Sequence, residues 1–244
     1  MIYRARHGQS SYGQAIGVIV LEDHIPYPPG CPGNATTFSY PVRYEVARGA
    51  SIESLKVSGT AESAAPFLEA GRALVKAGVR AITGNCGLMI SHQQYLAAEL
   101  PVPVLMSSLL QIPFVARALG PSDKIGILAS SKNNLKPHHL EIVTGGVPVS
   151  TVVSDMSGCE GFQSAIMREE GELDFFKVQS EVMSKVKSFL DGDISIRALV
   201  FECTDLSPYA RAVQQEFEIP VFDIITLIDF FHSASFRKDF KGHM

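Results

Sequence analysis

Short apolar runs rich in β-branched residues alternate along the chain with longer stretches whose apolar residues recur at helical spacing. The runs are nearly continuous, which predicts strands buried on both faces of a sheet. Strands that alternate with helices in this way indicate βαβ units and a parallel sheet. The pattern predicts strands over 16–21, 79–83, 102–106, 124–129, 147–153, 196–201 and 220–224, and helices over 61–77, 92–99, 109–119, 173–190 and 208–217.

Residues 26–50 interrupt this alternation. The segment is rich in Pro and Gly, and its one apolar run, Val42–Ala47, predicts a short strand within a long loop. Long loops of this kind often carry function. Arg43 and Arg48 in this loop are candidates to meet an acidic substrate. Cys31 in this loop and Cys159 in a later one are expected to be incidental exposed thiols.

The chain also resembles itself. At a shift of 117 positions Cys86 aligns with Cys203, and Pro103-Val104 aligns with Pro220-Val221; residues 16–18 resemble residues 125–127 at a shift of 109. A genuine repeat predicts two similar α/β lobes related by a pseudo-twofold axis, with the first lobe holding residues 1–105 and 209–244 and the second holding 106–208. Chance similarity between two βα units of like composition is the alternative.

Composition narrows the classes of function. A chain of 244 residues that is 46% hydrophobic can bury a core without disulfide or metal. The net charge of −4 argues against a nucleic-acid partner. No apolar run approaches the roughly 20 residues that span a membrane. The first run has no cleavage site of small residues, so no signal peptide is expected and the cytoplasm is the expected location.

The four cysteines do not fit a metal or disulfide framework. They form no CxxC pair and have no histidine at zinc-finger spacing, so no metal is expected. The motifs of zinc proteases, P-loop proteins, many dinucleotide enzymes and esterases are also missing from the sequence. His138-His139 is expected to be a solvated helix start, and His24 and His92 are expected to be ordinary loop or core histidines.

Two cysteines occupy equivalent places in the repeat. Cys86 and Cys203 each follow an apolar strand and precede a helix. The carboxyl ends of strands in open α/β sheets are where ligands bind, and a helix N-terminus lowers the pKa of a nearby thiol. Two such thiols facing each other can invert a carbon centre, one removing a proton as thiolate and the other donating a proton from the opposite side.

A carbanion formed in this way needs its adjacent carboxylate or carbonyl held by hydrogen-bond donors. Backbone N–H groups around Gly87 and Asp205 are candidates, together with the side chains of Asn85 and Thr204. These observations favour a racemase or isomerase that acts on a small carboxylate or carbonyl compound.

The segment Glu202–Ala210 (ECTDLSPYA), followed by IPVFD at 219–223, resembles the aspartate/glutamate racemase superfamily. That group includes glutamate, aspartate and hydantoin racemases, maleate isomerases and arylmalonate decarboxylases. Cys203, Thr204, Pro208 and Asp223 match its second-lobe signature. The resemblance implies two Rossmann-like lobes with parallel sheets, an active site in the cleft between them, chemistry without a cofactor, and one reactive cysteine in each lobe.

The first lobe departs from the family pattern, since Asn85 precedes Cys86 and no Thr follows it. The resemblance further places Ser130 and Ser131, at the end of KIGILASS, near the substrate. It puts Asp205 where glutamate racemases have a His that supports the thiol. It makes Asp23 the nearest candidate for the Asp that follows the first strand in those enzymes.

Retention of both thiols favours racemisation or isomerisation, with an amino acid such as aspartate or glutamate, or a hydantoin, as substrate. Three alternatives remain. They are a one-thiol decarboxylase or hydrolase of the arylmalonate decarboxylase type, a maleate isomerase-like enzyme, and a non-catalytic two-lobe ligand-binding protein. A homodimer or higher homo-oligomer is an expectation from the family alone.

Overall fold

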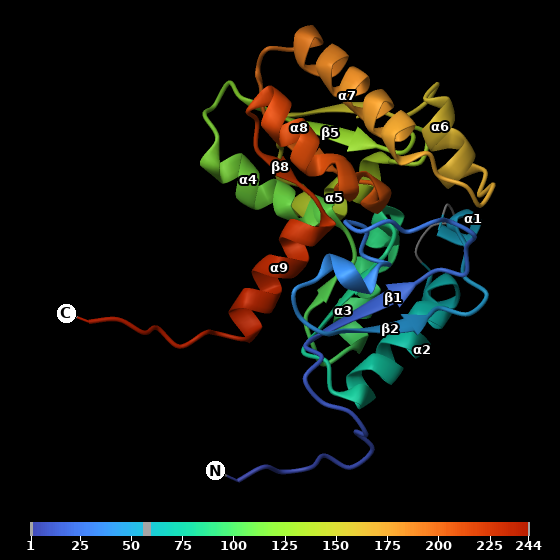
Figure 1. The fold of residues 1–244 in the computed structure, drawn as a ribbon, viewed down its shortest axis with the longest axis vertical. Helices are drawn as coiled ribbons and strands as arrows, with labels where there is room; N and C mark the ends of the chain where they lie inside the picture. Colours follow the sequence, from blue (N-terminus) through green and yellow to red (C-terminus); the bar gives the residue numbers. More distant parts are fainter. Residues whose placement is uncertain (1, 56–59, 244) are drawn as a thin grey trace.

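The computed structural model describes residues 2–55 and 60–243. The chain forms two four-stranded parallel sheets with helices packed around each (Figure 1). The strand order is β2-β1-β3-β4 in the first sheet and β6-β5-β7-β8 in the second. The α/β architecture with two similar lobes is therefore confirmed.

The first sheet and the elements around it come mostly from the first half of the chain. Its strands are β1 (Ile16–Val20), β2 (Val42–Val46), β3 (Ala81–Gly84) and β4 (Val104–Leu105). The helices and 3-10 turns beside it are η1 (Ala35–Thr37), α1 (Ile52–Leu55), α2 (Ala61–Ala77), η2 (Gly87–His92) and α3 (Gln93–Glu99).

The second sheet repeats this plan. Its strands are β5 (Lys124–Ala129), β6 (Thr151–Asp155), β7 (Ile196–Phe201) and β8 (Val221–Phe222). Its helices and turns are η3 (Ser108–Gln111), α4 (Ile112–Ala118), α5 (Pro137–Thr144), α6 (Glu160–Phe162), the π-helical turn η4 (Gln163–Met167), α7 (Phe175–Gly192), η5 (Thr204–Tyr209) and α8 (Ala210–Phe217).

The strand and helix patterns have clear local causes. The central strands β1, β3, β5 and β7 are almost entirely buried, as their continuous apolar runs predicted, whereas β2 and β6 at the sheet edges are partly exposed. Helix α2 has the predicted bounds because Thr60 and Ser63 cap its start reciprocally and Gly78, at φ 94°, ends it.

The internal repeat is a repeat of structure. The shift of 117 positions that aligns the two cysteines also aligns β3, η2, α3 and β4, in that order, with β7, η5, α8 and β8. Turns η2 and η5 are each six residues long and begin directly after a cysteine. The two cysteines therefore occupy the same place in two copies of one βηαβ unit.

The division between the lobes differs from the expected one. Residues 209–222 belong with the second sheet, because β8 pairs with β7 through Leu199 and Val221. The chain returns to the first lobe only with α9 (Ile224–Ser235), where Ile224 and Ile228 pack against the first-lobe residue Ile16. The repeat unit completes its sheet with β8 before the chain crosses over, so the crossing comes after residue 222.

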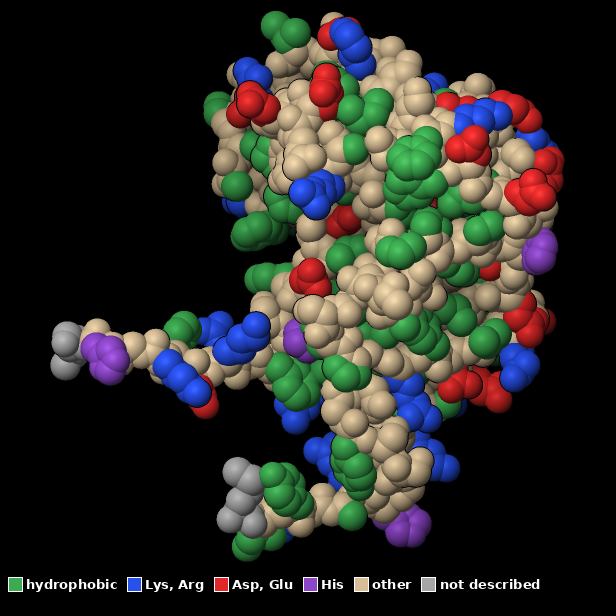
Figure 2. All heavy atoms as spheres, viewed as in Figure 1, with side chains coloured by type: hydrophobic (Ala, Val, Ile, Leu, Met, Phe, Trp, Pro, Cys, Tyr) green, Lys and Arg blue, Asp and Glu red, His purple; other side chains and the backbone are tan. Residues whose placement is uncertain are grey.

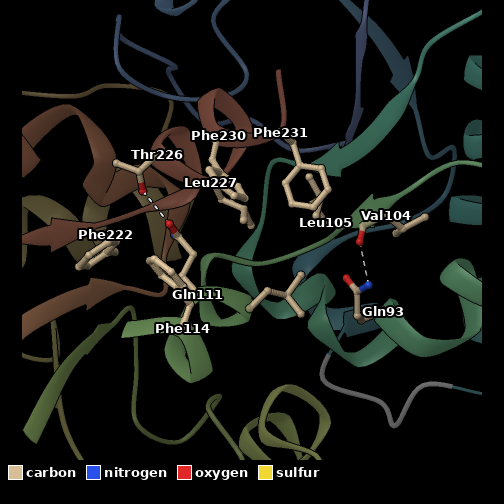
Figure 3. A pocket seen from close by; sticks show the side chains of 11 residues that line it. Gln93, Val104, Leu105, Gln111, Phe114, Phe222, Thr226, Leu227, Phe230 and Phe231 are labelled. Carbon is tan, nitrogen blue, oxygen red and sulfur yellow. Dashed lines mark hydrogen bonds between the residues drawn. The ribbon is translucent and has the colours of Figure 1, made fainter. Parts of the chain in front are cut away.

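An apolar groove of about 510 Å³ lies between α9, α4 and β4 (Figure 3). Phe114 and Phe230, both exposed, lie on its walls. Its amides are already bonded, with Gln93 donating to the Val104 carbonyl and Gln111 accepting from Thr226. None of the site residues proposed from the sequence lines this groove.

Within the described ranges, no helix combines the length and apolar character needed to cross a membrane. Acidic and basic side chains are interspersed over the second lobe on the face shown in Figure 2, and Lys and Arg side chains gather near the two projecting ends.

Candidate active site

The two repeat-related cysteines share one local setting. Cys86 and Cys203 each precede a 3-10 turn beyond the carboxyl end of a central strand. In each case the backbone N–H two residues later, that of Leu88 or Asp205, hydrogen-bonds to the sulfur. Cys203 is buried and Cys86 is partly buried.

The two turns that follow the cysteines, η2 and η5 (the cysteine turns), contact each other across the lobes. The Thr204 hydroxyl donates a hydrogen bond to the backbone carbonyl of Asn85. Gly87 lies directly on Glu202, whose carbonyl oxygen would collide with a Cβ at position 87. Cys86 and Cys203 are close enough to act on each other electrostatically. The structure therefore brings together the two thiols that the repeat paired.

Asp205 forms a hydrogen bond with the second thiol, Cys203. Cys203 Sγ donates to Asp205 Oδ2 at 3.6 Å, and Cys31 Sγ donates to the other oxygen, Oδ1, at 3.8 Å. Burial and the negative charge of Asp23 raise the pKa of Asp205 to about 7. The expectation that Cys31 is an exposed, incidental thiol is wrong, because only 1% of it is exposed and it contacts the site.

Asp23 joins the site through a tyrosine. The Tyr27 hydroxyl donates to Asp23 Oδ2 at 2.5 Å and accepts from Asn85 Nδ2 at 2.8 Å. Asn85 Oδ1 accepts the Leu21 backbone N–H at 3.1 Å, so this side chain links the cysteine turn to the end of β1. Asp23 also raises the pKa of the Cys86 thiol, although less than burial does.

The site contains several buried carboxyl groups, and these, together with burial, reverse the expected direction of the thiol pKa shifts. Burial raises the pKa of Cys86, and the carboxyl groups of Glu202, Asp205 and Asp23 raise it further. Burial, Asp205 and Glu202 do the same for Cys203. Burial also raises the pKa of Glu202 to about 7. The backbone N–H groups lower both thiol pKa values, but burial and like charge outweigh them, so both thiols are protonated in the free site.

The remaining proposed residues have varied settings. Ser130 is buried at the end of β5, and its backbone hydrogen-bonds to the Glu202 carboxyl. The Ser131 hydroxyl accepts the Asn133 N–H at 3.3 Å and thus serves its own turn. Arg43 donates to Ser11 Oγ at 2.8 Å, away from the cysteine turns.

Tyr27, Cys31 and Glu202 were missed as site residues. Tyr27 and Cys31 lie in the long loop that the sequence marked as functional, and Gly30, at φ 106°, brings that loop against Pro208 of η5. Glu202 directly precedes Cys203 in the family motif. The sequence therefore contained a signal for the loop, but none for which of its side chains turn inward.

A cavity of about 460 Å³ opens beside Asp23 and Tyr27. Tyr44 of β2 and Gly171 of the second lobe contribute to its walls, so it borders both lobes. His24 also lines it and is exposed.

Comparison with known proteins places the chain in a family. No family profile matches it. It is 31% identical over 228 residues to a dimethylsulfoniopropionate lyase of Durusdinium sp. clade D, covering 89% of this chain and 73% of that protein. The chain belongs to the family of dimethylsulfoniopropionate lyases. Dimethylsulfoniopropionate lyase 5 of Emiliania huxleyi (strain CCMP1516) is 29% identical, and the alignment covers 91% of this chain but only 45% of that relative.

Solved structures share the fold of this lyase-family chain. Allantoin racemase from Pseudomonas fluorescens matches with a TM-score of 0.58 at 12% identity, covering 93% of this chain and all of that one. Glutamate racemase from Francisella tularensis matches with a TM-score of 0.54 at 16% identity, covering 94% of this chain and 85% of that one. Unliganded arylmalonate decarboxylase matches with a TM-score of 0.53 at 11% identity, covering 85% of this chain and 86% of that one. The expected resemblance to the Asp/Glu/hydantoin racemase superfamily is thus confirmed in the fold.

Proposed function

We propose that this protein cleaves dimethylsulfoniopropionate by eliminating dimethyl sulfide, with Cys203 as the base that removes the proton next to the carboxylate. The reaction class comes from the relatives, which are named dimethylsulfoniopropionate lyases. The observation on this chain that carries the proposal is the acidic lining of the site: its two thiols lie among the carboxyl groups of Asp23, Glu202 and Asp205.

A site surrounded by carboxyl groups favours a substrate that carries a positive charge. Dimethylsulfoniopropionate has a sulfonium cation at one end and a carboxylate at the other. Glutamate and aspartate have two carboxylates, and the second would be repelled by these acidic side chains. The cavity beside Asp23 adds the rings of Tyr27 and Tyr44, which suit a methylated cation.

A bound cation also makes the thiol easier to ionise. Burial and neighbouring carboxyl groups keep Cys203 protonated in the free site. A sulfonium group beside the sulfur offsets that negative charge and lowers the pKa of the thiol as substrate binds. Asp205 is placed to take the proton, because its Oδ2 already accepts a hydrogen bond from Cys203.

The elimination itself needs one base. The Cys203 thiolate takes the proton from the carbon next to the carboxylate, and the electron pair of that C–H bond forms the carbon–carbon double bond. The bond from the neighbouring carbon to sulfur breaks, and its electron pair leaves with sulfur. Acrylate and neutral dimethyl sulfide are formed, Cys203 is again a thiol, and Asp205 releases its proton to solvent.

The substrate carboxylate needs donors, and the backbone N–H groups of turns η2 and η5 are the candidates we favour. The Thr204 side chain already bonds to the Asn85 carbonyl, so we assign it the task of holding the two turns together. The Asn85 side chain already bonds to Tyr27 and to the Leu21 N–H, so we assign it the task of holding the first turn to the end of β1 and the long loop.

The test is to incubate the purified protein with dimethylsulfoniopropionate and measure dimethyl sulfide by gas chromatography and acrylate by liquid chromatography. Cys203→Ala should reduce kcat/KM by about 10³-fold, within the usual range for loss of a general base. Cys86→Ala should reduce it less, because elimination requires one base. Cys159→Ala is the matched control. Release of no dimethyl sulfide, or full activity in Cys203→Ala, would contradict the proposal.

The equivalent settings of Cys86 and Cys203 favour a second candidate, a racemase that uses both thiols in turn. Racemisation in deuterated water exchanges the hydrogen next to the carboxylate without elimination, and it is lost when either cysteine is replaced. Amino acids and hydantoins tested in deuterated water, with exchange followed by NMR, separate this activity from the lyase.

A further inference from the structure

We propose that Cys31 is a positioning residue that holds the Asp205 carboxylate in place to accept the proton of Cys203. The inference deepens the proposed lyase function and rests on it for the role of Asp205. Its basis is geometric: two thiols from different parts of the chain donate to the two oxygens of one carboxyl group.

The loop fixes Cys31 firmly. Its backbone N–H donates to the Pro28 carbonyl at 3.0 Å, and its own carbonyl accepts from the Thr37 hydroxyl at 2.7 Å and the Asn34 N–H at 3.2 Å. Gly30 then packs against Pro208, in the same turn as Asp205. Cys31 is therefore held against η5 by its backbone, and its side chain does not depend on the substrate for its position.

A fixed thiol on Oδ1 has two effects on Asp205. It orients the carboxylate so that Oδ2 remains directed at Cys203. It also lowers the pKa of Asp205, because the hydrogen bond stabilises the ionised form. Burial and Asp205 raise the pKa of Cys31 itself, so this thiol keeps its proton and remains a donor at neutral pH.

Cys159, which is buried and not exposed as expected, provides a matched control. Cys159 directly precedes α6 without a capping hydrogen bond from its side chain, and it belongs to the second-lobe core that includes Phe162 and Val182. A substitution there removes a buried thiol of the same size without changing the hydrogen bonds of Asp205.

The first experiment compares the pH dependence of kcat/KM for Cys31→Ala, Cys31→Ser and Cys159→Ala. Cys31→Ala should move the acid limb to higher pH by about 0.5–1 unit and lower kcat several-fold. Cys31→Ser keeps a hydrogen-bond donor, so its acid limb and its kcat should both lie close to those of the wild type. Cys159→Ala should match the wild type. A wild-type pH profile in Cys31→Ala would overturn the proposal, as would failure of Cys31→Ser, if folded by circular dichroism, to restore the profile.

A double-mutant comparison tests whether Cys31 acts through Asp205. In an Asp205→Asn background, replacing Cys31 with Ala should change kcat/KM little further. Additive effects of the two substitutions would mean that Cys31 acts independently of Asp205 and would overturn the inference.

A readout without turnover separates this inference from the lyase assignment. The rate at which iodoacetamide alkylates Cys203 is measured by mass spectrometry at a series of pH values. This rate should rise near pH 7 as Asp205 ionises, and Cys31→Ala should move the rise to higher pH. A shift without any lyase activity would support the role of Cys31 while rejecting the substrate. No shift would reject the role of Cys31, whatever the substrate.

Discussion

Asp23 and Asp205 illustrate how single residues in this site influence each other through charge. They come from opposite lobes, and the negative charge of Asp23 adds to burial in raising the pKa of Asp205 to about 7. The same two groups raise the pKa of Cys86. The site is therefore tuned by like charges held close together, an arrangement that a cationic substrate relieves.

Replacing Asp23 with Asn should lower the pKa of Asp205, because it removes a nearby negative charge. Asp205 accepts a proton only when ionised, so activity should extend to lower pH and the acid limb of the kcat/KM profile should move down. Asp155→Asn, which removes a strand-end carboxyl from the second lobe, is the control. An acid limb that stays in place in Asp23→Asn would show that Asp23 does not act on the group that controls the limb.

At the scale of elements, turns η2 and η5 can approach each other closely because Gly87, at their contact, has no side chain. Gly87 begins η2 and lies on the backbone of Glu202, just before η5. Any Cβ there would collide with that backbone, which cannot move like the end of a flexible side chain. The approach of the two repeat units, and so of their thiols, depends on this glycine.

Gly87→Ala should therefore separate the turns and lower kcat/KM by about 10² or more. The overpacking should also reduce the free energy of unfolding by about 1–3 kcal/mol. Lyase assays and urea denaturation measure the two effects. Gly192→Ala, near the end of α7 where an added Cβ meets nothing within 4 Å, should leave activity unchanged. Near-normal activity in Gly87→Ala would mean that the close approach is not required.

At the scale of the whole molecule, two buried histidines couple stability to pH. His92 in the first lobe packs against Phe67 with the two rings tilted, and within the described residues its ring nitrogens have no hydrogen-bond partner. His139 in the second lobe contacts Ser91 Oγ across the lobes at 3.0 Å. Burial lowers the pKa of each to about 4. The expectation of a solvated His139 is wrong, because this side chain packs inward at the start of α5.

Both histidines should make the fold sensitive to acid. Their pKa values are about 4 when folded and near 6.5 when unfolded, so between these values the unfolded chain binds more protons. The contribution of each histidine to the free energy of unfolding should fall as pH drops from 6.5 to 4, by about 1 kcal/mol per pH unit after allowing for solvent screening, whereas Asp205 and Glu202, with raised pKa values, act in the opposite direction. Urea denaturation at pH 7 and pH 5 measures this.

The variants His92→Leu and His139→Gln should each reduce that difference between pH 7 and pH 5. His138→Gln, at the exposed neighbouring position, should not. An unchanged difference in both buried-site variants would assign the acid sensitivity to other groups.

The sequence by itself determined the elements and the pairing of the two thiols. Strands β5 and β7 and helix α2 have the predicted bounds, because continuous apolar runs and capping residues act locally. Cys86 and Cys203 could be paired because a repeat written into the sequence folds into two copies of one unit. Of α5 only the helix start at His138-His139 was expected, and α9, which packs on the first lobe, was not predicted.

Only the tertiary structure decided the environment of those thiols. Cys31 meets Asp205, 174 positions away, and Asn85 meets Thr204 across 119 positions, contacts that leave no local pattern in a sequence. The thiol pKa values rise, although helix N-termini predicted a fall, because burial and convergent carboxyl groups outweigh the backbone N–H groups. Local order follows from neighbouring residues, whereas charge and burial at a site follow from everything that folds around it.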